Sequence, residues 1–214
     1  MWWMVSGTSN GMAKEIKPLT YSPDSLNGIS QKTIEIHHGK LYAGYVNKAN
    51  EISEKLGELR KSGKVEGNQI FSELRGLKQG ETFARNGMYL HENYFAILGG
   101  DGVPKGEVLK AIEEKWGTFE DFKTYFSACG MSARGWAMLC WDMHEKKLMQ
   151  YNCDAQNHGG VWGCIPIIAL DVYEHSYFID TGSDRATYIK SFFDNLNWGK
   201  IEEFYQRAKK YELD

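Results

Sequence analysis

The first half of the chain is dominated by apolar residues that recur with the period of an α-helix. Turn-forming residues over 15–29 indicate an irregular entry segment, and the pattern then predicts a helix over 30–61 with a serine N-cap. On this helix His37, Leu41 and Tyr45 follow one another at a spacing of four residues, so we expect them to share one face.

A second helix is expected beyond a short turn over 62–67, which contains two glycines. It begins at Asn68 and ends before the glycine cluster over 99–102, and Gly76 and Gly80 predict an interruption within it. Two long helices joined by a short turn form an antiparallel hairpin. The glycine cluster is the best candidate for a domain boundary.

The second half of the chain mixes short amphipathic helices with strongly apolar, strand-like runs. Strands are expected over 135–142, 148–153 and 165–170. Helices are expected over 105–115, over 118–128 with Thr118 as cap, from 173, over 184–195 and from 198 onward. Helices first and a small sheet with helices afterwards is an α+β order.

These elements predict a fold with an N-terminal antiparallel helical hairpin and a C-terminal domain. The C-terminal domain is expected to hold a three-stranded antiparallel sheet with surrounding helices. We divide the chain into a disordered leader or expression remnant over 1–14, a hairpin domain over 15–100 and an α+β domain over 101–214. The leader begins with an apolar Trp-rich run that is too short for the core of a signal peptide.

Composition narrows the class of protein. The chain has 214 residues, 42% hydrophobic and 25% charged, which is typical of a soluble globular protein with a substantial core. A net charge of −3 argues against a nucleic-acid binder, and no apolar run is long enough to span a membrane. The four cysteines form no closely spaced pair, so we expect reduced thiols in a cytoplasmic protein.

Six histidines are the candidate metal ligands. His144 lies in an expected hairpin turn and is interpreted as solvated, and His38 points about 100° around the helix from His37. His37 and His91 each lie in mid-helix on a face with aromatic and small residues. Taken alone, either is a core histidine or a ligand, and the helical pattern leaves both readings open.

The segment from Asp171 to His175 changes that balance, because it directly follows the apolar strand over 165–170. It places a carboxylate and an imidazole at a strand end that faces the core. A buried carboxylate is destabilising unless it is paired or bound to a cation. A metal ion held by His37, His91, Asp171 and His175 would remove the penalty at all four positions.

At this point several ordered motifs over about residues 16–210 carry a family resemblance. They are Glu35-Ile36-His37-His38-Gly39-Lys40, Tyr45-Val46-Asn47, Arg134-Gly135-Trp136-Ala137, Asp171-Val172-Tyr173-Glu174-His175, Tyr177-Phe178-Ile179 and Asn197-Trp198. In these motifs the chain resembles the iron/manganese superoxide dismutases. The resemblance implies that the metal lies between the two domains and that its ligands are His37, His91, Asp171 and His175. It also implies one manganese ion per subunit, with iron as the other possible metal.

The resemblance assigns the reaction as the conversion of two superoxide anions and two protons to dioxygen and hydrogen peroxide. Gln156 matches the family position that hydrogen-bonds the metal-bound solvent, and Tyr45 would complete a proton relay with it. The other interpretation of Gln156 is an ordinary loop amide, and that of Tyr45 is a tyrosine at the core edge. In many iron enzymes the active-site glutamine stands four residues before the second histidine, where this chain has Gly87. This arrangement favours manganese.

The resemblance also implies roles for residues around the ligands. Glu174 would cross a subunit interface to the ligand histidine of a second copy, which implies a homodimer or a tetramer, and Tyr177 would face the same interface. The other implied members of the surroundings are Trp136 and Tyr173 beside the ligands, and Lys40 and Arg185 as groups that steer the anion.

Two departures from the family pattern keep other functions open. Leu41 stands where the family usually has a polar residue at the mouth of the substrate funnel, and Met138 stands where many members have a tryptophan. A non-catalytic relative used for binding or structure is therefore one alternative. Another is a different non-haem metal oxidoreductase, although such oxygenases typically use two histidines and one carboxylate.

Overall fold

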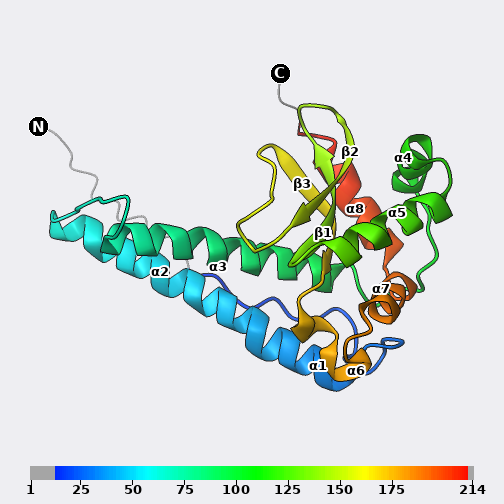
Figure 1. The fold of residues 1–214 in the computed structure, drawn as a ribbon, viewed down its shortest axis with the longest axis horizontal. Coiled ribbons are helices and arrows are strands. Elements are labelled where there is room, and N and C mark those ends of the chain that lie inside the picture. Colours follow the sequence, from blue (N-terminus) through cyan, green and yellow to red (C-terminus); the bar gives the residue numbers. More distant parts are fainter. Residues whose placement is uncertain (1–12, 212–214) are drawn as a thin grey trace, which may run out of the picture.

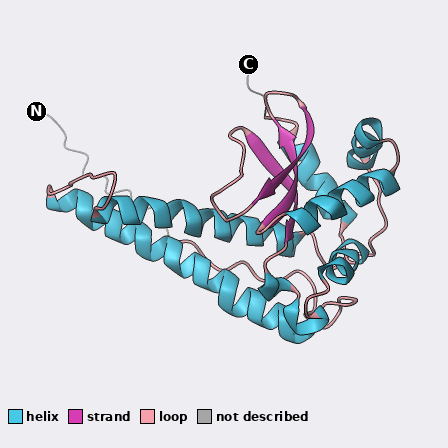
Figure 2. Cartoon of the chain, viewed as in Figure 1, coloured by secondary structure: helices cyan, strands magenta, loops and turns pink. Residues whose placement is uncertain are grey.

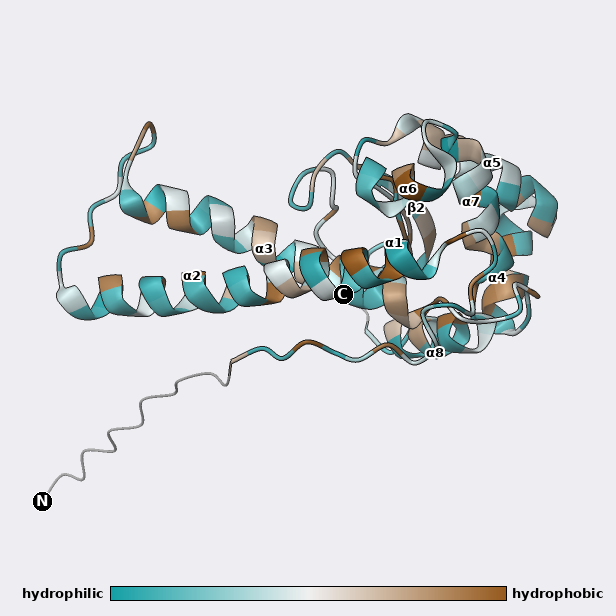
Figure 3. Cartoon of the chain, turned by 90° about the horizontal axis from the view of Figure 1, so that it is seen from below, coloured by the Kyte–Doolittle hydropathy of each residue, from teal (hydrophilic) through white to brown (hydrophobic). Residues whose placement is uncertain are grey.

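A long antiparallel helical hairpin projects from a body of sheet and helices in the computed structural model, which describes residues 13–211 (Figure 1). The hairpin consists of α1 (Gln31–Ile36), the π-helical segment η1 (His37–Tyr42), α2 (Ala43–Ser62) and α3 (Glu73–Ala96). The projecting halves of α2 and α3 are mainly hydrophilic on the outside (Figure 3). A small apolar cluster of Ala49, Ile52 and Ala84 holds these halves together.

The π-helical segment corrects the expected face of the first helix. The N–H of Ala43 donates to the carbonyl of His38, five residues earlier. The buried positions therefore step from His37 to Tyr42, whereas Leu41 is partly exposed. A step of five residues fits one π turn, and such turns are frequent at functional sites. The expectation that Leu41 shares the face of His37 was wrong for this reason.

The second helix of the hairpin is continuous, so the interruption expected at Gly76 and Gly80 was wrong. It begins after Ser72, whose hydroxyl accepts from the N–H of Arg75. A glycine inside a helix is unfavourable by about 1 kcal/mol relative to alanine. Packing of α3 on α2 outweighs this, and a side chain at Gly80 would lie 3.1 Å from the Cδ1 of Ile52.

The C-terminal body contains a three-stranded antiparallel sheet with the strand order β2-β1-β3 (Figure 2). The strands are β1 (Trp136–Asp142), β2 (Lys147–Cys153) and β3 (Cys164–Asp171). The helices are α4 (Glu107–Trp116), α5 (Phe119–Ser132), η2 (Glu174–Ser176), α6 (Phe178–Thr181), α7 (Arg185–Asp194) and α8 (Trp198–Ala208). The predicted α+β class, with its hairpin and antiparallel sheet, is confirmed.

Local signals set the boundaries of these elements. Thr118 and Asp121 form a capping box at the start of α5, as expected for a helix beginning there. The central strand β1 is buried along its whole length, and its register pairs Trp136 with Asp171. The single helix expected from Tyr173 is instead a short 3-10 turn followed by the four-residue helix α6.

The structure describes the chain from residue 13 to residue 211. Residues 1–12, most of the predicted leader, lie outside the described residues. Lys14 belongs to the described part, and its backbone makes two hydrogen bonds with the side chain of Asn50 on α2. Between residues 13 and 211 no helix has the length and apolar character needed to cross a bilayer. All four cysteines are free thiols.

Candidate metal centre

Four elements from both halves of the chain each contribute one candidate ligand. His37 opens the π-helical segment, His91 lies on α3, Asp171 ends β3 and His175 lies on the 3-10 turn η2. The apolar strand carries Asp171 into the core and then stops, so the carboxylate is completely buried. His37 and His91 are also completely buried, whereas the His175 side chain is 28% exposed.

The three imidazoles converge on one carboxylate oxygen. The Oδ2 atom of Asp171 lies 3.2 Å from the Nε2 atom of His37, 3.4 Å from that of His91 and 3.2 Å from that of His175. One ligand atom from each residue lies within 4.8 Å of every other. First-row metal ions with bonds of about 2.1 Å space their ligand atoms about 3 to 4 Å apart. The distances therefore fit a single ion.

Hydrogen bonds outside the cluster orient the ligand atoms toward its centre. The Nδ1–H of His91 donates to the carbonyl of Gly87 at 2.6 Å, so its Nε2 atom carries the lone pair. This Nε2 atom is buried and has no hydrogen-bond partner among the described residues. The N–H of Tyr173 donates to Oδ1 of Asp171 at 2.9 Å, which leaves Oδ2 facing the imidazoles. An unpartnered, buried nitrogen aimed at a carboxylate is the donor arrangement that a metal ion satisfies.

The protonation states point the same way. Burial lowers the pKa of His91 to about 3 and also lowers the pKa of His37, so both imidazoles are neutral. Burial alone would lower the pKa of His175, but the hydrogen bond and charge of Asp171 raise it. Burial opposes ionisation of Asp171, yet hydrogen bonds from His175 and His37 lower its pKa. The raised pKa of His175 and the lowered pKa of Asp171 both reflect the attraction between this imidazole and the buried carboxylate, and a bound cation would supply positive charge to the same carboxylate.

Aromatic rings pack around the ligands and limit their movement. The rings of Tyr94 and Phe95 lie 5.1 and 5.0 Å from that of His37. Trp136 and Tyr45 each lie 5.1 Å from the ring of His91, by centroid distance.

The predicted neighbour of the fourth ligand is also in place. Tyr173 stacks on His175, with ring centroids 5.4 Å apart. Ring contacts of this kind hold each imidazole in one orientation before any ion binds.

Gln156 and Tyr45 meet beside this wall. The indole N–H of Trp136 donates to Oε1 of Gln156 at 2.8 Å, and Nε2 of Gln156 donates to the hydroxyl of Tyr45 at 3.0 Å. An indole only donates, so the orientation of the Gln156 amide is determined. Gln156 is 3% exposed, which does not fit an ordinary loop amide. A side chain at Gly87 would lie 2.5 Å from the ring of Tyr45, so the position offers no room for a glutamine.

The remaining predicted site residues are more scattered. Lys40 is exposed, and its side chain makes no hydrogen bond or ion pair with any described residue. Arg185 donates from Nε to the hydroxyl of Tyr177 and from Nη1 to the carbonyls of Gly130, Met131 and Ala133. Through these contacts Arg185 links α7 to the end of α5.

Tyr177 and Glu174 differ in accessibility. Tyr177 is 4% exposed and stacks on Tyr188 inside its own chain, and its contact with a second subunit stays a prediction. The neighbouring Phe178 is 54% exposed. Glu174 is exposed, and its carboxylate has no hydrogen-bond or ion-pair partner among residues 13–211.

Two neighbours of the ligands were not among the predicted site residues. Tyr42 stacks on His91 at a centroid distance of 6.4 Å, and Tyr188 donates its hydroxyl to the carbonyl of Asp171 at 2.7 Å. The five-residue step between His37 and Tyr42 is visible only once the π turn is known. Tyr188 lies 17 residues from Asp171 along the chain, and no local pattern connects the two.

Three neutral imidazoles and one carboxylate around a single point define a mononuclear centre for a first-row redox metal. Residues 14–99 match the family model for the α-hairpin domain of iron/manganese superoxide dismutases, and residues 104–204 match the model for their C-terminal domain. The chain therefore belongs to the iron/manganese superoxide dismutase family. It is an enzyme of that class, with superoxide as substrate and manganese or iron as metal, as the sequence predicted.

Individual relatives differ in their metal. The chain is 41% identical over 190 residues to the iron superoxide dismutase of Aquifex pyrophilus, covering 88% of this chain and 89% of that protein. It is 36% identical over 197 residues to the manganese superoxide dismutase of Haloarcula marismortui, covering 91% and 94%. It is 37% identical over 191 residues to the iron enzyme of Cupriavidus metallidurans, covering 87% and 93%. Overall similarity therefore does not decide the metal.

Replacing His175 with alanine should remove metal retention, because one of the four ligand atoms and the partner of Asp171 are lost together. We expect metal content after gel filtration to fall by at least about tenfold. The matched control is His144→Ala, since His144 is exposed in the turn between β1 and β2. Elemental analysis gives the readout, and full metal occupancy in the His175→Ala protein would refute the ligand assignment.

Proposed function

We propose that this chain is a manganese-dependent superoxide dismutase whose metal ligands are His37, His91, Asp171 and His175. The observation that carries the choice of metal is the glutamine position. Gln156 from the C-terminal half is buried beside the ligands, and the space next to Gly87 is filled by the ring of Tyr45. The resemblance associates this arrangement with manganese. The family models end at residue 99 and begin again at residue 104, which supports the proposed domain boundary near residue 100.

A bound manganese or iron ion supplies one-electron oxidation and reduction at this centre. The protein contributes one negative charge, from Asp171, and three neutral donors. Rings on several sides of His37 and His91 exclude bulk water from these two ligands. In such surroundings, the hydrogen-bond partners of bound solvent strongly influence the redox potential.

Peroxide formation consumes two protons, and we assign their delivery to Tyr45 and Gln156. Burial and the charge of Asp171 raise the pKa of Tyr45, and the hydrogen bond from Gln156 only partly offsets this. Tyr45 is therefore a neutral phenol at pH 7 and holds a transferable proton on its hydroxyl. The Gln156 amide lies 3.0 Å from that hydroxyl and fixes its position. Trp136 in turn holds the amide.

Lys40 is the group that we assign to attraction of the superoxide anion. The chain carries a net charge of −3, so any steering of an anion has to come from a local positive field. Lys40 is exposed on the π-helical segment that begins with His37, and it has no acidic partner among the described residues. Arg185 is less suited to this role, because its guanidinium is committed to carbonyl groups.

We further propose a homodimer in the cytoplasm. Exposed Glu174 lies next to His175, whose side chain is 28% exposed, and Phe178 and Ile179 expose apolar surface beside them. A second copy could bring its Glu174 to this imidazole and cover the apolar side chains. A tetramer built from two such dimers is the other assembly that we keep open. Four free cysteines support a reducing compartment.

Metal exchange tests the function directly. Protein stripped of metal and reloaded separately with manganese or iron should dismute superoxide efficiently only in the manganese form. Both forms should contain about one ion per chain, measured by elemental analysis on the assayed samples. Activity confined to the iron form would overturn the argument from Gln156 and Gly87. Stoichiometric metal without activity in either form would favour a non-catalytic relative.

Replacing Gln156 with leucine should keep the metal and lower kcat about 10- to 100-fold, because Tyr45 loses the amide that positions its hydroxyl. The dependence of kcat on pH should change as well. Gln206→Leu is the control, since Gln206 bonds only to Glu202 within α8 among the described residues. Stopped-flow measurement of superoxide decay gives kcat and its dependence on pH. Unchanged kinetics would show that Gln156 is only a packing residue.

The proposed dimer can be tested at its apolar surface. Phe178→Asp should shift the chain from a mass near twice 24.4 kDa to the monomer mass, because a charge would be buried at the interface. Tyr125→Asp is the matched control, as Tyr125 is an exposed aromatic residue on α5. Sedimentation equilibrium measures the mass. A wild-type chain that sediments as a monomer contradicts the proposal.

A further inference from the structure

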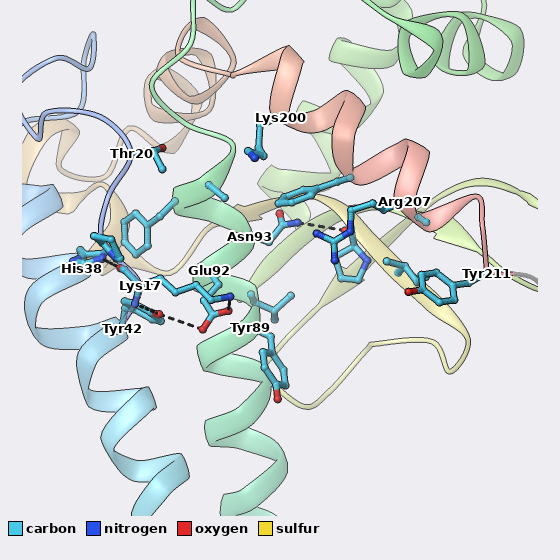
Figure 4. Close-up of a pocket in the computed structure, with 18 residues that line it drawn as sticks. Lys17, Thr20, His38, Tyr42, Tyr89, Glu92, Asn93, Lys200, Arg207 and Tyr211 are labelled. Atoms are coloured by element: carbon cyan, nitrogen blue, oxygen red, sulfur yellow. Dashed lines mark hydrogen bonds and ion pairs between the residues drawn. The ribbon is translucent and has the colours of Figure 1, made fainter. Parts of the chain in front are cut away.

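A cleft of about 610 Å³ lies between the N-terminal segment, α3, β3 and α8 (Figure 4). This volume is within the range of cavities that bind small molecules. None of the four candidate metal ligands lines the cleft, and neither Tyr45 nor Gln156 does. Nothing in the dismutase reaction accounts for it.

The floor of the cleft is apolar. It is formed by Leu90 and Phe95 on α3, by Ile165 and Pro166 on β3, and by Phe204 on α8. Two exposed tyrosines, Tyr89 and Tyr211, also belong to its lining. A ligand with a flat or extended apolar body could bury that body on these side chains, which is the usual source of affinity in such sites.

The polar groups at one side of the cleft already satisfy one another. Lys17 forms an ion pair with Glu92, and Tyr42 donates its hydroxyl to the same carboxylate at 3.2 Å. The hydroxyl of Tyr42 also accepts from the N–H of Lys17 at 3.0 Å. His38 bonds through Nε2 to the carbonyl of Lys17 at 2.8 Å. This network leaves no free charge for a ligand.

The side formed by α8 differs, because it offers a cationic side chain that has no partner among residues 13–211. Arg207 is exposed, and its side chain makes no hydrogen bond or ion pair with any described residue. Lys200 on the same helix is paired with Glu203. The side chain of Asn93, between the two sides, donates to the carbonyl of Pro166 and accepts from the N–H of Ala169. Figure 4 shows Arg207 extending across the cleft toward Asn93.

The charges lining the cleft favour an anion. Of the three cations that line the cleft, Lys17 is paired with Glu92 and Lys200 with Glu203, so Arg207 supplies the positive charge that is available to an anion in a chain whose net charge is −3. The planar guanidinium of Arg207 can bind a carboxylate through two parallel hydrogen bonds. We propose that this cleft is a binding site for a small anionic amphiphile, a carboxylate on an apolar body, with Arg207 as its anchor.

The cleft and the metal centre are separate but share a wall. Tyr42 lines the cleft on one side and stacks on His91 on the other. Glu92 lines the cleft and directly follows His91 along α3. A ligand bound at Arg207 would therefore occupy a site of its own, and loss of that ligand should leave the dismutase reaction in place.

The experiment uses the manganese-loaded full chain and the fluorescent anion anilinonaphthalene sulfonate as probe. We expect fluorescence to rise and saturate at one probe per chain, and decanoate to displace the probe. Decylammonium, which has the same chain length and the opposite charge, should not displace it. Arg207→Gln should weaken probe binding about tenfold, the loss expected for one charge-assisted pair. The affinity of Arg207→Lys for the probe should lie between that of Arg207→Gln and that of the wild type.

Two further variants locate the site. Ala96→Phe should abolish saturable binding by filling the cleft, which Ala96 lines from the end of α3. Arg60→Gln is the charge control, because Arg60 is exposed in the last turn of α2, outside the cleft lining. It should bind the probe as the wild type does. Metal content and dismutase activity of Arg207→Gln should equal those of the wild type, which separates this test from that of the catalytic function.

Three outcomes would contradict the proposed binding site. Equal affinity of Arg207→Gln and the wild type for the probe would show that Arg207 does not anchor the ligand. Competition by decylammonium as strong as that by decanoate would show binding through apolar contact alone. Probe binding that fails to saturate would show that the cleft does not act as a defined site.

Discussion

The structure depends on one buried negative charge. Asp171 ends β3 with its carboxylate completely inside the protein, and an unpaired carboxylate there would be strongly destabilising. The N–H of Tyr173 satisfies Oδ1, and three imidazole nitrogens converge on Oδ2. Two of these imidazoles come from the hairpin. The balance of this charge therefore requires the hairpin to dock on the sheet, and the metal centre and the junction of the two halves are the same place.

Aromatic packing turns that electrostatic requirement into a defined geometry. Imidazoles could satisfy a carboxylate in several orientations, but the rings around His37 and His91 leave one. The same packing places Tyr45 in the space next to Gly87 and brings its hydroxyl to Gln156. A glycine is needed at that position because any side chain would collide with the tyrosine ring. Support for the ligands and positioning of the proton donor thus depend on one set of contacts.

Helix α3 serves two different surfaces. His91 is buried toward the metal centre, and the next residue, Glu92, lies in the cleft with Lys17 and Tyr42. Tyr42 is buried between the two because the π turn advances the helix face by one residue. The turn therefore affects both the packing behind His91 and the wall of the cleft. A purely α-helical segment would have directed Leu41 to that position.

The sequence by itself determined the elements whose signals are local: the hairpin, the helix cap at Thr118, the three strands and the carboxylate at a strand end. A carboxylate at a strand end also indicated a metal, because a buried charge needs partners, and the family resemblance implied the four candidate ligands together with Gln156 and Tyr45. Tertiary structure alone decided the π turn, the unbroken α3, the burial of Tyr177 and the cleft at Arg207. Each of these depends on contacts between segments far apart in the chain, which override local propensity and leave no periodic trace in the sequence.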